Sequence, residues 1–153
     1  MTDMGEGLSF DLQQIPNPVD VEMLIANLVE FNDSAAPPER YSPIAVFARF
    51  DGILIGGVSG LTHWNWLFVS QLWVAGDHRG AGIGSRLMSI IECAAIDRGA
   101  TAAHLNTFDF QSLGFYRARG YRDVGSLRDF PIGHKLHFLA KVFELSQTAP
   151  YGR

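Results

Sequence analysis

The stretch that decides the fold lies in the middle of the chain, where an apolar segment runs into closely spaced glycines. It reads Gln71-Leu72-Trp73-Val74-Ala75-Gly76-Asp77-His78-Arg79-Gly80-Ala81-Gly82-Ile83-Gly84-Ser85-Arg86. Residues 66–74 are rich in β-branched and aromatic side chains, which favours a strand. After the glycines, apolar residues recur with helical spacing at Ile83, Leu87, Ile90, Ile91, Ala94 and Ala95. The stretch therefore predicts a strand, a tight turn and a helix.

The glycine-rich turn has the features of an anion site. It places backbone N–H groups, free of side-chain bulk, at the positive end of a helix dipole, and Arg79 at its mouth can add a bidentate contact to a phosphate. A nucleoside-triphosphatase loop needs Gly-Lys-Ser/Thr, but Gly84-Ser85-Arg86 contains no lysine. A dinucleotide loop needs G-x-G-x-x-G, whereas the glycines stand at 80, 82 and 84. We therefore expect phosphate binding of another kind, against the plainer interpretation that the glycines only form a tight turn.

The elements around this stretch predict one α/β (α+β) domain over residues 1–153, with 146–153 as a frayed tail. Strands are expected at 9–15, 44–50, 53–62, 66–74, 102–108, 121–127 and 135–143, and helices from Val19 to Phe31, from Ile83, and at 111–119. The helix from Val19 is expected to bury one face. We expect a mixed, mostly antiparallel sheet of about seven strands with helices on both faces, and a parallel step across the strand, turn and helix.

Composition narrows the function classes. The 153 residues carry 12 basic and 16 acidic side chains, a formal net charge of −4, which argues against nucleic acid as a partner. The single Cys93 cannot form an internal disulfide, and the first residues lack the basic and apolar pattern of a secretory signal. No run approaches the roughly 18 apolar residues of a membrane span. We expect a soluble, cytoplasmic protein without membrane or metal partners.

The turn resembles the pyrophosphate-binding signature of the Gcn5-related N-acetyltransferase (GNAT) superfamily, Q/R-x-x-G-x-G/A. Residues Arg79 to Gly84 match it position for position. The resemblance covers roughly residues 44–143 and implies binding of acetyl-CoA as co-substrate, with the amide of Val74 polarising the thioester carbonyl. The implied cofactor-binding residues are Leu72, Trp73, Val74, Arg79, Gly80, Ala81, Gly82, Ile83, Gly84 and Ser85. The implied activity is acyl transfer to an amine.

A second segment resembles another element of that superfamily, N-x-x-A-x-x-F-Y-x-x-x-G-F/Y. Phe115-Tyr116 and Gly120-Tyr121 match it, whereas Asp109 stands where the family often has asparagine. The resemblance implies that Tyr116 is the general acid for the leaving thiolate. Transfer from a phenol of pKa about 10 to a thiolate of pKa about 8.5 is uphill by roughly 2 kcal/mol. The plainer interpretation of Tyr116 is a core aromatic residue on a short amphipathic helix.

The general base and the amine pocket are less well marked. Asp109, His63 and His134 are the candidates for a base, and a water chain to solvent would serve as well. We take Tyr116, Asp109 and His134 as catalytic candidates, and His63, Trp64 and Asp109 as candidates for substrate binding. For the histidines, packing or turn capping is an equally plain interpretation.

The predicted reaction is transfer of acetyl from acetyl-CoA to a primary amine of a small molecule by direct attack. Two alternatives stay open: a non-catalytic acyl-CoA-binding or sensing module, and a protein or peptide N-acetyltransferase. Tyr116 separates the first alternative from the enzyme, because a pure binder needs no placed phenol. The resemblance also allows a homodimer.

Overall fold

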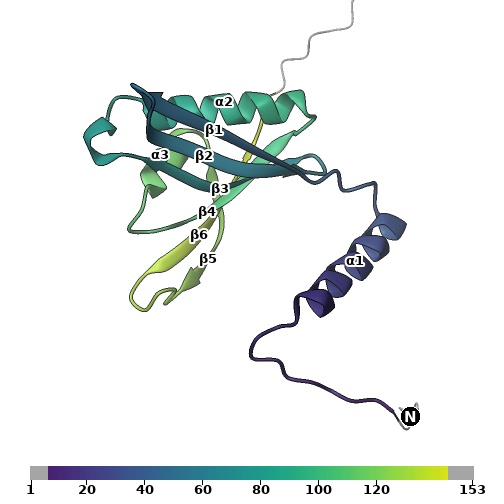
Figure 1. Ribbon diagram of the computed structural model, residues 1–153. Helices are drawn as coiled ribbons and strands as arrows, with labels where there is room; N and C mark the ends of the chain where they lie inside the picture. The colour runs from purple at the N-terminus through teal and green to yellow at the C-terminus, as the bar shows by residue number, and fades with distance from the viewer. Residues whose placement is uncertain (1–6, 145–153) are drawn as a thin grey trace, which may run out of the picture. The chain divides into compact units, whose positions relative to one another are not determined.

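The computed structural model describes residues 7–144 and divides the chain into two units, residues 1–39 and 40–153 (Figure 1). Each unit is described by itself. The expected frayed tail at 146–153 lies outside the described residues. No helix within residues 7–144 is long and apolar enough to cross a membrane.

Over its described residues, 7–39, the first unit contains one helix, α1 (Pro18–Ala35). Pro18 occupies its first turn, and the side chain of Asn17 caps it by accepting a hydrogen bond from the Val19 amide at 3.0 Å. The expectation that the helix from Val19 buries one face is wrong: α1 contains no buried residue, because residues 7–39 offer no second element against which its apolar side chains could pack. The strand expected at 9–15 is wrong: these residues form neither helix nor strand. Strand-forming side chains are not sufficient there, since a strand needs a neighbour to pair with.

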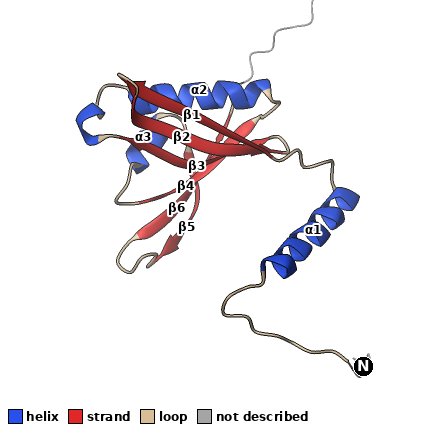
Figure 2. Ribbon diagram, viewed as in Figure 1, coloured by secondary structure: helices blue, strands red, loops and turns tan. Residues whose placement is uncertain are grey.

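In the second unit, residues 40–144 are built on one six-stranded sheet in the order β1-β2-β3-β4-β6-β5. The strands are β1 (Ser42–Phe50), β2 (Ile53–His63), β3 (Trp66–Val74), β4 (Ala102–Phe108), β5 (Arg122–Arg128) and β6 (Lys135–Val142). All neighbours are antiparallel except β3 and β4, which are parallel (Figure 2). The mostly antiparallel sheet with one parallel step is confirmed. The sheet has six strands, and about seven were expected, because residues 9–15 do not form a strand.

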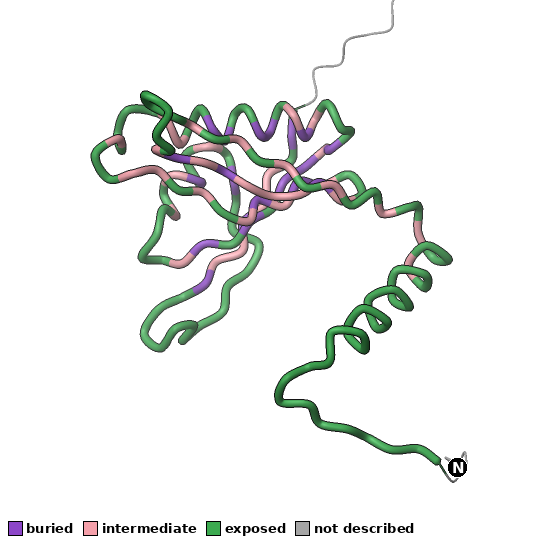
Figure 3. Tube along the Cα trace, in the orientation of Figure 1, coloured by how far each residue is buried: buried purple, intermediate pink, exposed green. Residues whose placement is uncertain are grey.

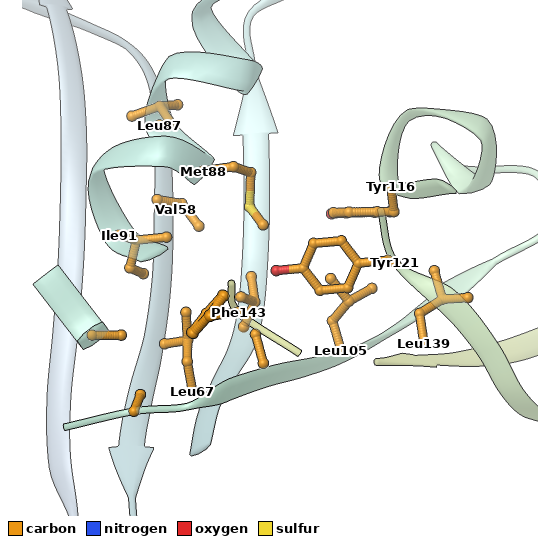
Figure 4. Close-up of a cluster of buried hydrophobic side chains, with 14 residues drawn as sticks. Val58, Leu67, Leu87, Met88, Ile91, Leu105, Tyr116, Tyr121, Leu139 and Phe143 are labelled. Carbon is orange, nitrogen blue, oxygen red and sulfur yellow. The ribbon is translucent and has the colours of Figure 1, made fainter. Parts of the chain in front are cut away.

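The parallel step is made by the predicted turn and helix. Between β3 and β4 lie a short 3-10 turn, η1 (Gly76–His78), and the helix α2 (Ile83–Asp97), and α3 (Leu113–Ala118) follows β4. One side of α2 is buried against the sheet, as the purple segments of Figure 3 show. The core joins α2, the sheet and α3 through residues that include Leu67, Met88, Ile91, Tyr116 and Leu139 (Figure 4).

β3 and β4 separate part of the way along their length. Their pairing ends at Val69 and Leu105. On the other side of β3, the register with β2 shifts between Ser59 and Gly60, so that Ser70 is an extra residue that forms a β-bulge. Beyond the bulge, β3 stays paired with β2 while it leaves β4. The sheet therefore opens on the side where β3 runs into the glycine-rich turn.

Candidate functional site

A cavity of about 900 Å³ fills the opening between β3 and β4. Its walls are the second half of β3, the glycine-rich turn, the end of β4 and the helix α3. The lining residues are Val69, Ser70, Gln71, Leu72, Trp73, Val74, His78, Arg79, Gly80, Gly82, Ile83, Gly84, Ser85, Asn106, Thr107, Phe110, Gln111, Ser112, Phe115 and Tyr116. Nine of the ten predicted cofactor-binding residues are in this set, and Ala81 is not. No carboxylate lines the cavity among the described residues, which favours an anionic occupant.

The glycine-rich turn presents backbone rather than side chains to this cavity. Gly80 and Gly82 have φ values of 77° and 79°, in the left-handed region that favours glycine, and a Cβ at either position would meet no atom within 4 Å. Gly82 is also the N-cap of α2, and no side chain caps the helix there. The first amides of α2 therefore start at an open, positively polarised helix end. This geometry suits a phosphate.

Arg79 lies beside the same turn. Its Nε donates a hydrogen bond to the carbonyl oxygen of Val74 at 2.9 Å, which folds the side chain back over the end of β3. This contact uses one of the five N–H groups of the guanidinium. The guanidinium is thereby held at the cavity wall, and its other N–H groups remain available to a ligand.

Tyr116 lines the cavity on the side formed by α3. It belongs to α3, is 8% exposed, and contacts the rings of Phe115 and Tyr121 edge-on. Burial raises the pKa of the Tyr116 phenol above its usual value, so the group stays protonated. The cavity is therefore lined both by a turn whose geometry suits an anion and by a protonated phenol.

Asp109 and His134, predicted separately, form a pair. Asp109 follows β4 and His134 precedes β6, and Asp109 Oδ1 lies 2.9 Å from His134 Nδ1 while Oδ2 accepts from the Lys135 amide at 3.0 Å. Desolvation opposes ionisation of Asp109, but these hydrogen bonds and the charge of the imidazole outweigh it and lower the pKa of the carboxyl. Neither residue lines the cavity, although the His134 ring contacts Phe110, which does.

The other predicted substrate residues lie elsewhere. His63 ends β2 and Trp64 is in the β2–β3 turn, at the end of β3 that is still paired with β4. Their ring centroids lie 4.4 Å apart with the planes tilted by 44°, and burial together with His63 lowers the pKa of His104. Burial is the larger cause. The structure does not bring His63 or Trp64 to the cavity.

Several lining residues were not predicted from the sequence. Gln111 Oε1 accepts hydrogen bonds from Thr107 Oγ1 at 3.2 Å and from the Phe108 amide at 3.0 Å, so it shapes the connection between β4 and α3. Asn106 lies on β4 just beyond its last pair with β3. A polar residue in a predicted central strand is the signal that could have marked Asn106. Gln111 carries no such signal, because its role depends on the turn that follows β4.

Comparisons with known proteins agree with this geometry. Residues 11–121 match the model of the acetyltransferase (GNAT) family. Blasticidin-S acetyltransferase from Streptomyces morookaense is 43% identical over 108 residues, which cover 70% of this chain and 78% of that protein.

Solved structures show the same fold over nearly the whole chain. An acetyltransferase from Bacillus cereus superposes with a TM-score of 0.80 at 28% identity, covering 87% of this chain and 98% of that one. A putative acetyltransferase from Agrobacterium tumefaciens superposes with a TM-score of 0.82 at 27% identity, covering 89% and 100%. With the sheet order, the open strand pair and the glycine-rich turn, these matches show that the chain belongs to the GNAT family of acetyltransferases.

Proposed function

We propose that this protein transfers the acetyl group of acetyl-CoA to a primary amine of a small molecule by direct attack. The amine nitrogen forms a bond to the thioester carbonyl carbon, the carbon–sulfur bond breaks, and the Tyr116 phenol gives its proton to the leaving thiolate. The nitrogen then releases its surplus proton to solvent, and the Tyr116 phenolate takes up a proton from solvent. The observation that carries the proposal is the single cavity lined both by the turn at 79–85 and by Tyr116. A cavity that held CoA only for sensing would not need that phenol.

The two ends of the donor would be held by different parts of the cavity. The first amides of α2 and the guanidinium of Arg79 are the expected partners of its diphosphate. Main-chain groups of Leu72, Trp73 and Val74 lie on the β3 edge that has left β4, where amide groups of a ligand could replace the missing strand. The absence of carboxylates from the described lining avoids repulsion of the phosphates.

The proton that leaves the amine needs a separate path. A protonated primary amine must become neutral before it attacks, and we assign this step to the Asp109–His134 pair acting through solvent. The pair is open to solvent, with side-chain exposures of 34% for Asp109 and 47% for His134. Asp109 stays ionised because its pKa is low, so it can orient the imidazole and stabilise its charged form.

The test is a panel of amines assayed by release of free thiol from acetyl-CoA. The panel includes blasticidin S, because a relative is named for that substrate, together with simple diamines and peptides with a free N-terminus. We expect turnover with at least one small amine and none with the peptides. CoA binding without turnover of any amine would favour the sensing module, and turnover of peptides alone would favour a peptide acetyltransferase.

The proton donor is tested by Tyr116→Phe. Removing the phenol while keeping the ring is expected to lower kcat by roughly 10²-fold, the usual worth of a general acid, with the Kd for CoA nearly unchanged. Because burial raises the pKa of Tyr116, kcat of the wild type should show no alkaline loss from this group below about pH 10. Full turnover in the variant would remove Tyr116 as the acid.

A further inference from the structure

Glu92 is a buried acid in the middle of α2, outside the cavity. The residue is 7% exposed, and both carboxylate oxygens are engaged. Oε1 accepts a hydrogen bond from the Tyr121 hydroxyl at 2.9 Å, and Oε2 accepts from Lys141 Nζ at 3.0 Å and faces Arg119 Nη2 at 3.5 Å. A buried carboxylate satisfied in this way is costly to disturb. Glu92 is therefore a fixed point that joins α2 to the segment after α3 and to β6.

Two of these partners also hold Tyr116. Its backbone carbonyl accepts hydrogen bonds from the amides of Arg119 at 3.0 Å and Tyr121 at 3.1 Å. Its ring meets that of Tyr121 edge-on, with centroids 6.0 Å apart and planes at 74°. Figure 4 shows the two rings side by side, with the Tyr121 hydroxyl directed toward α2. The backbone and the ring of Tyr116 are thus both in contact with residues that bind Glu92.

A second contact links the beginning of α2 to the same helix α3. A Cβ on Gly84 would lie 3.6 Å from the ring of Phe115, so the first turn of α2 approaches that ring closely. The Arg119 guanidinium lies 5.9 Å from the centre of the same ring. The helix α2 therefore meets α3 and its continuation both at the phosphate-binding turn and at Glu92.

We infer that Glu92, acting through Tyr121 and Arg119, is a positioning residue that fixes the Tyr116 hydroxyl relative to the turn at the start of α2. The inference rests on the proposed function, in which a donor held by the turn is protonated by Tyr116. The turn and the Tyr116 hydroxyl must keep a fixed separation, because a displacement of about 1 Å can lower the rate by roughly 10²-fold. Glu92 itself touches neither substrate.

Tyr121 offers a clean way to test the inference. Burial and the Glu92 charge raise the pKa of its phenol, so it stays a donor to Glu92 throughout the working pH range. Tyr121→Phe removes this hydrogen bond and changes little volume. We expect kcat to fall about tenfold while the KM for acetyl-CoA and the Kd for CoA stay within about twofold. Glu92→Gln should likewise lower kcat while the KM for acetyl-CoA and the Kd for CoA stay nearly unchanged.

The deciding measurement is a double-mutant cycle. In a Tyr116→Phe background the positioned hydroxyl is gone, so Tyr121→Phe should cause no further loss of kcat. The control is Asp123→Asn, which breaks an exposed ion pair with Arg117 on the same helix α3 and should leave kcat unchanged. Circular dichroism melting of each variant establishes that it is folded, and Tyr121→Phe decides the matter if Glu92→Gln does not fold.

Three outcomes would overturn the inference, and they differ in what they imply. Unchanged kcat in Tyr121→Phe, beside a large loss in Tyr116→Phe, would remove the positioning role and leave the proposed function standing. An equal loss from Tyr121→Phe with and without the Tyr116 hydroxyl would show that the effect does not pass through the phenol. Full turnover in Tyr116→Phe alone would contradict the proposed acid, and the positioning role would end with it.

Discussion

The two halves of β3 differ although they belong to one strand. Residues 66–69 pair with β2 on one side and β4 on the other, and they bury Leu67 and Val69 almost completely. After the bulge at Ser70, residues 71–74 pair with β2 alone, and Trp73 is 49% exposed. Both halves contribute to the same core, because Leu72 and Val74 also pack against it. The difference lies in which edge of the strand has a neighbour.

One extra residue produces that difference. Core-facing positions alternate at 67 and 69, and after the bulge at Ser70 they continue at 72 and 74 in place of 71 and 73. The bulge lies directly after Val69, the last residue of β3 that pairs with β4. Backbone groups on the free edge then need partners other than β4. A strand that supports the core is thereby also a wall of the cavity.

The largest effect that distinguishes the two halves is expected from Leu67→Ala. Leu67 is fully buried in the paired half, so the lost contacts and the remaining cavity should lower the free energy of unfolding by about 4 kcal/mol in urea denaturation. Trp73→Ala, in the open half, is the control and should cost less than about 1 kcal/mol. Similar losses from both substitutions would contradict the division of β3 into a half packed on both sides and an open half.

The next effect comes from Gly60→Ala, at the joint between the halves. A Cβ on Gly60 would lie 2.1 Å from the carbonyl oxygen of Phe68, which is backbone and cannot rotate away. Strands β2 and β3 must move apart at the bulge, at a cost of about 3 kcal/mol in the free energy of unfolding. Gly125→Ala on β5, where a Cβ meets nothing within 4 Å, is the matched control and should be neutral. A neutral Gly60→Ala would mean that the bulge tolerates a wider strand spacing.

A smaller effect is expected from Arg79→Ala at the end of the open half. Loss of the guanidinium should raise the Kd for CoA by about tenfold in isothermal titration calorimetry, and more at low salt than at high salt. The substitution also removes the hydrogen bond to Val74. Arg86→Ala, a neighbouring cation outside the cavity lining, should leave the Kd within about twofold of the wild type. Equal changes from the two substitutions would indicate general charge attraction without a specific phosphate contact.

Much of the second unit could be predicted from sequence because its signals are local. The bounds of β3 and β4 were predicted to the residue, and α2 begins at the predicted Ile83. The glycine spacing was informative because left-handed φ values at Gly80 and Gly82 leave few residue types possible. The bulge at Ser70 could not be predicted in this way, because residues 66–69 and 72–74 are all apolar and show no alternation in the sequence.

The remaining features depend on residues far apart in the chain. Asp109 and His134 were both predicted as catalytic candidates, but nothing local indicates that their side chains meet at 2.9 Å. His63 and Trp64 were chosen for their residue types, and the topology places them at the paired end of β3. The strand expected at 9–15 failed for the same reason, since propensity does not supply a pairing partner. The sequence therefore indicated local structure and candidate residue types, but it did not indicate which distant residues would meet.

The smallest expected effect is on stability at low pH, and it concerns the end of β4. There β4 no longer pairs with β3, so other contacts must hold it in place. Beyond that point the Asp109 amide donates a hydrogen bond to the Lys135 carbonyl oxygen. The Asp109 carboxylate accepts a hydrogen bond from the Lys135 amide and contacts the His134 ring. The pKa of Asp109 is lowered in the folded protein, so the unfolded state binds more protons between the folded value and about 3.9. The contribution of this carboxylate to stability is therefore present above about pH 4 and is lost as the pH falls through the folded pKa.

Asp109→Asn removes that titration and should flatten the acid side of the stability profile measured by urea denaturation between about pH 2 and 6. Asp123→Asn, in an exposed ion pair with Arg117, is the control for the loss of one surface carboxylate. If the Asp109→Asn and wild-type profiles run parallel down to the lowest pH, the carboxylate does not anchor β4. The backbone pairing with β6 would then be sufficient to keep β4 in place beside the open half of β3.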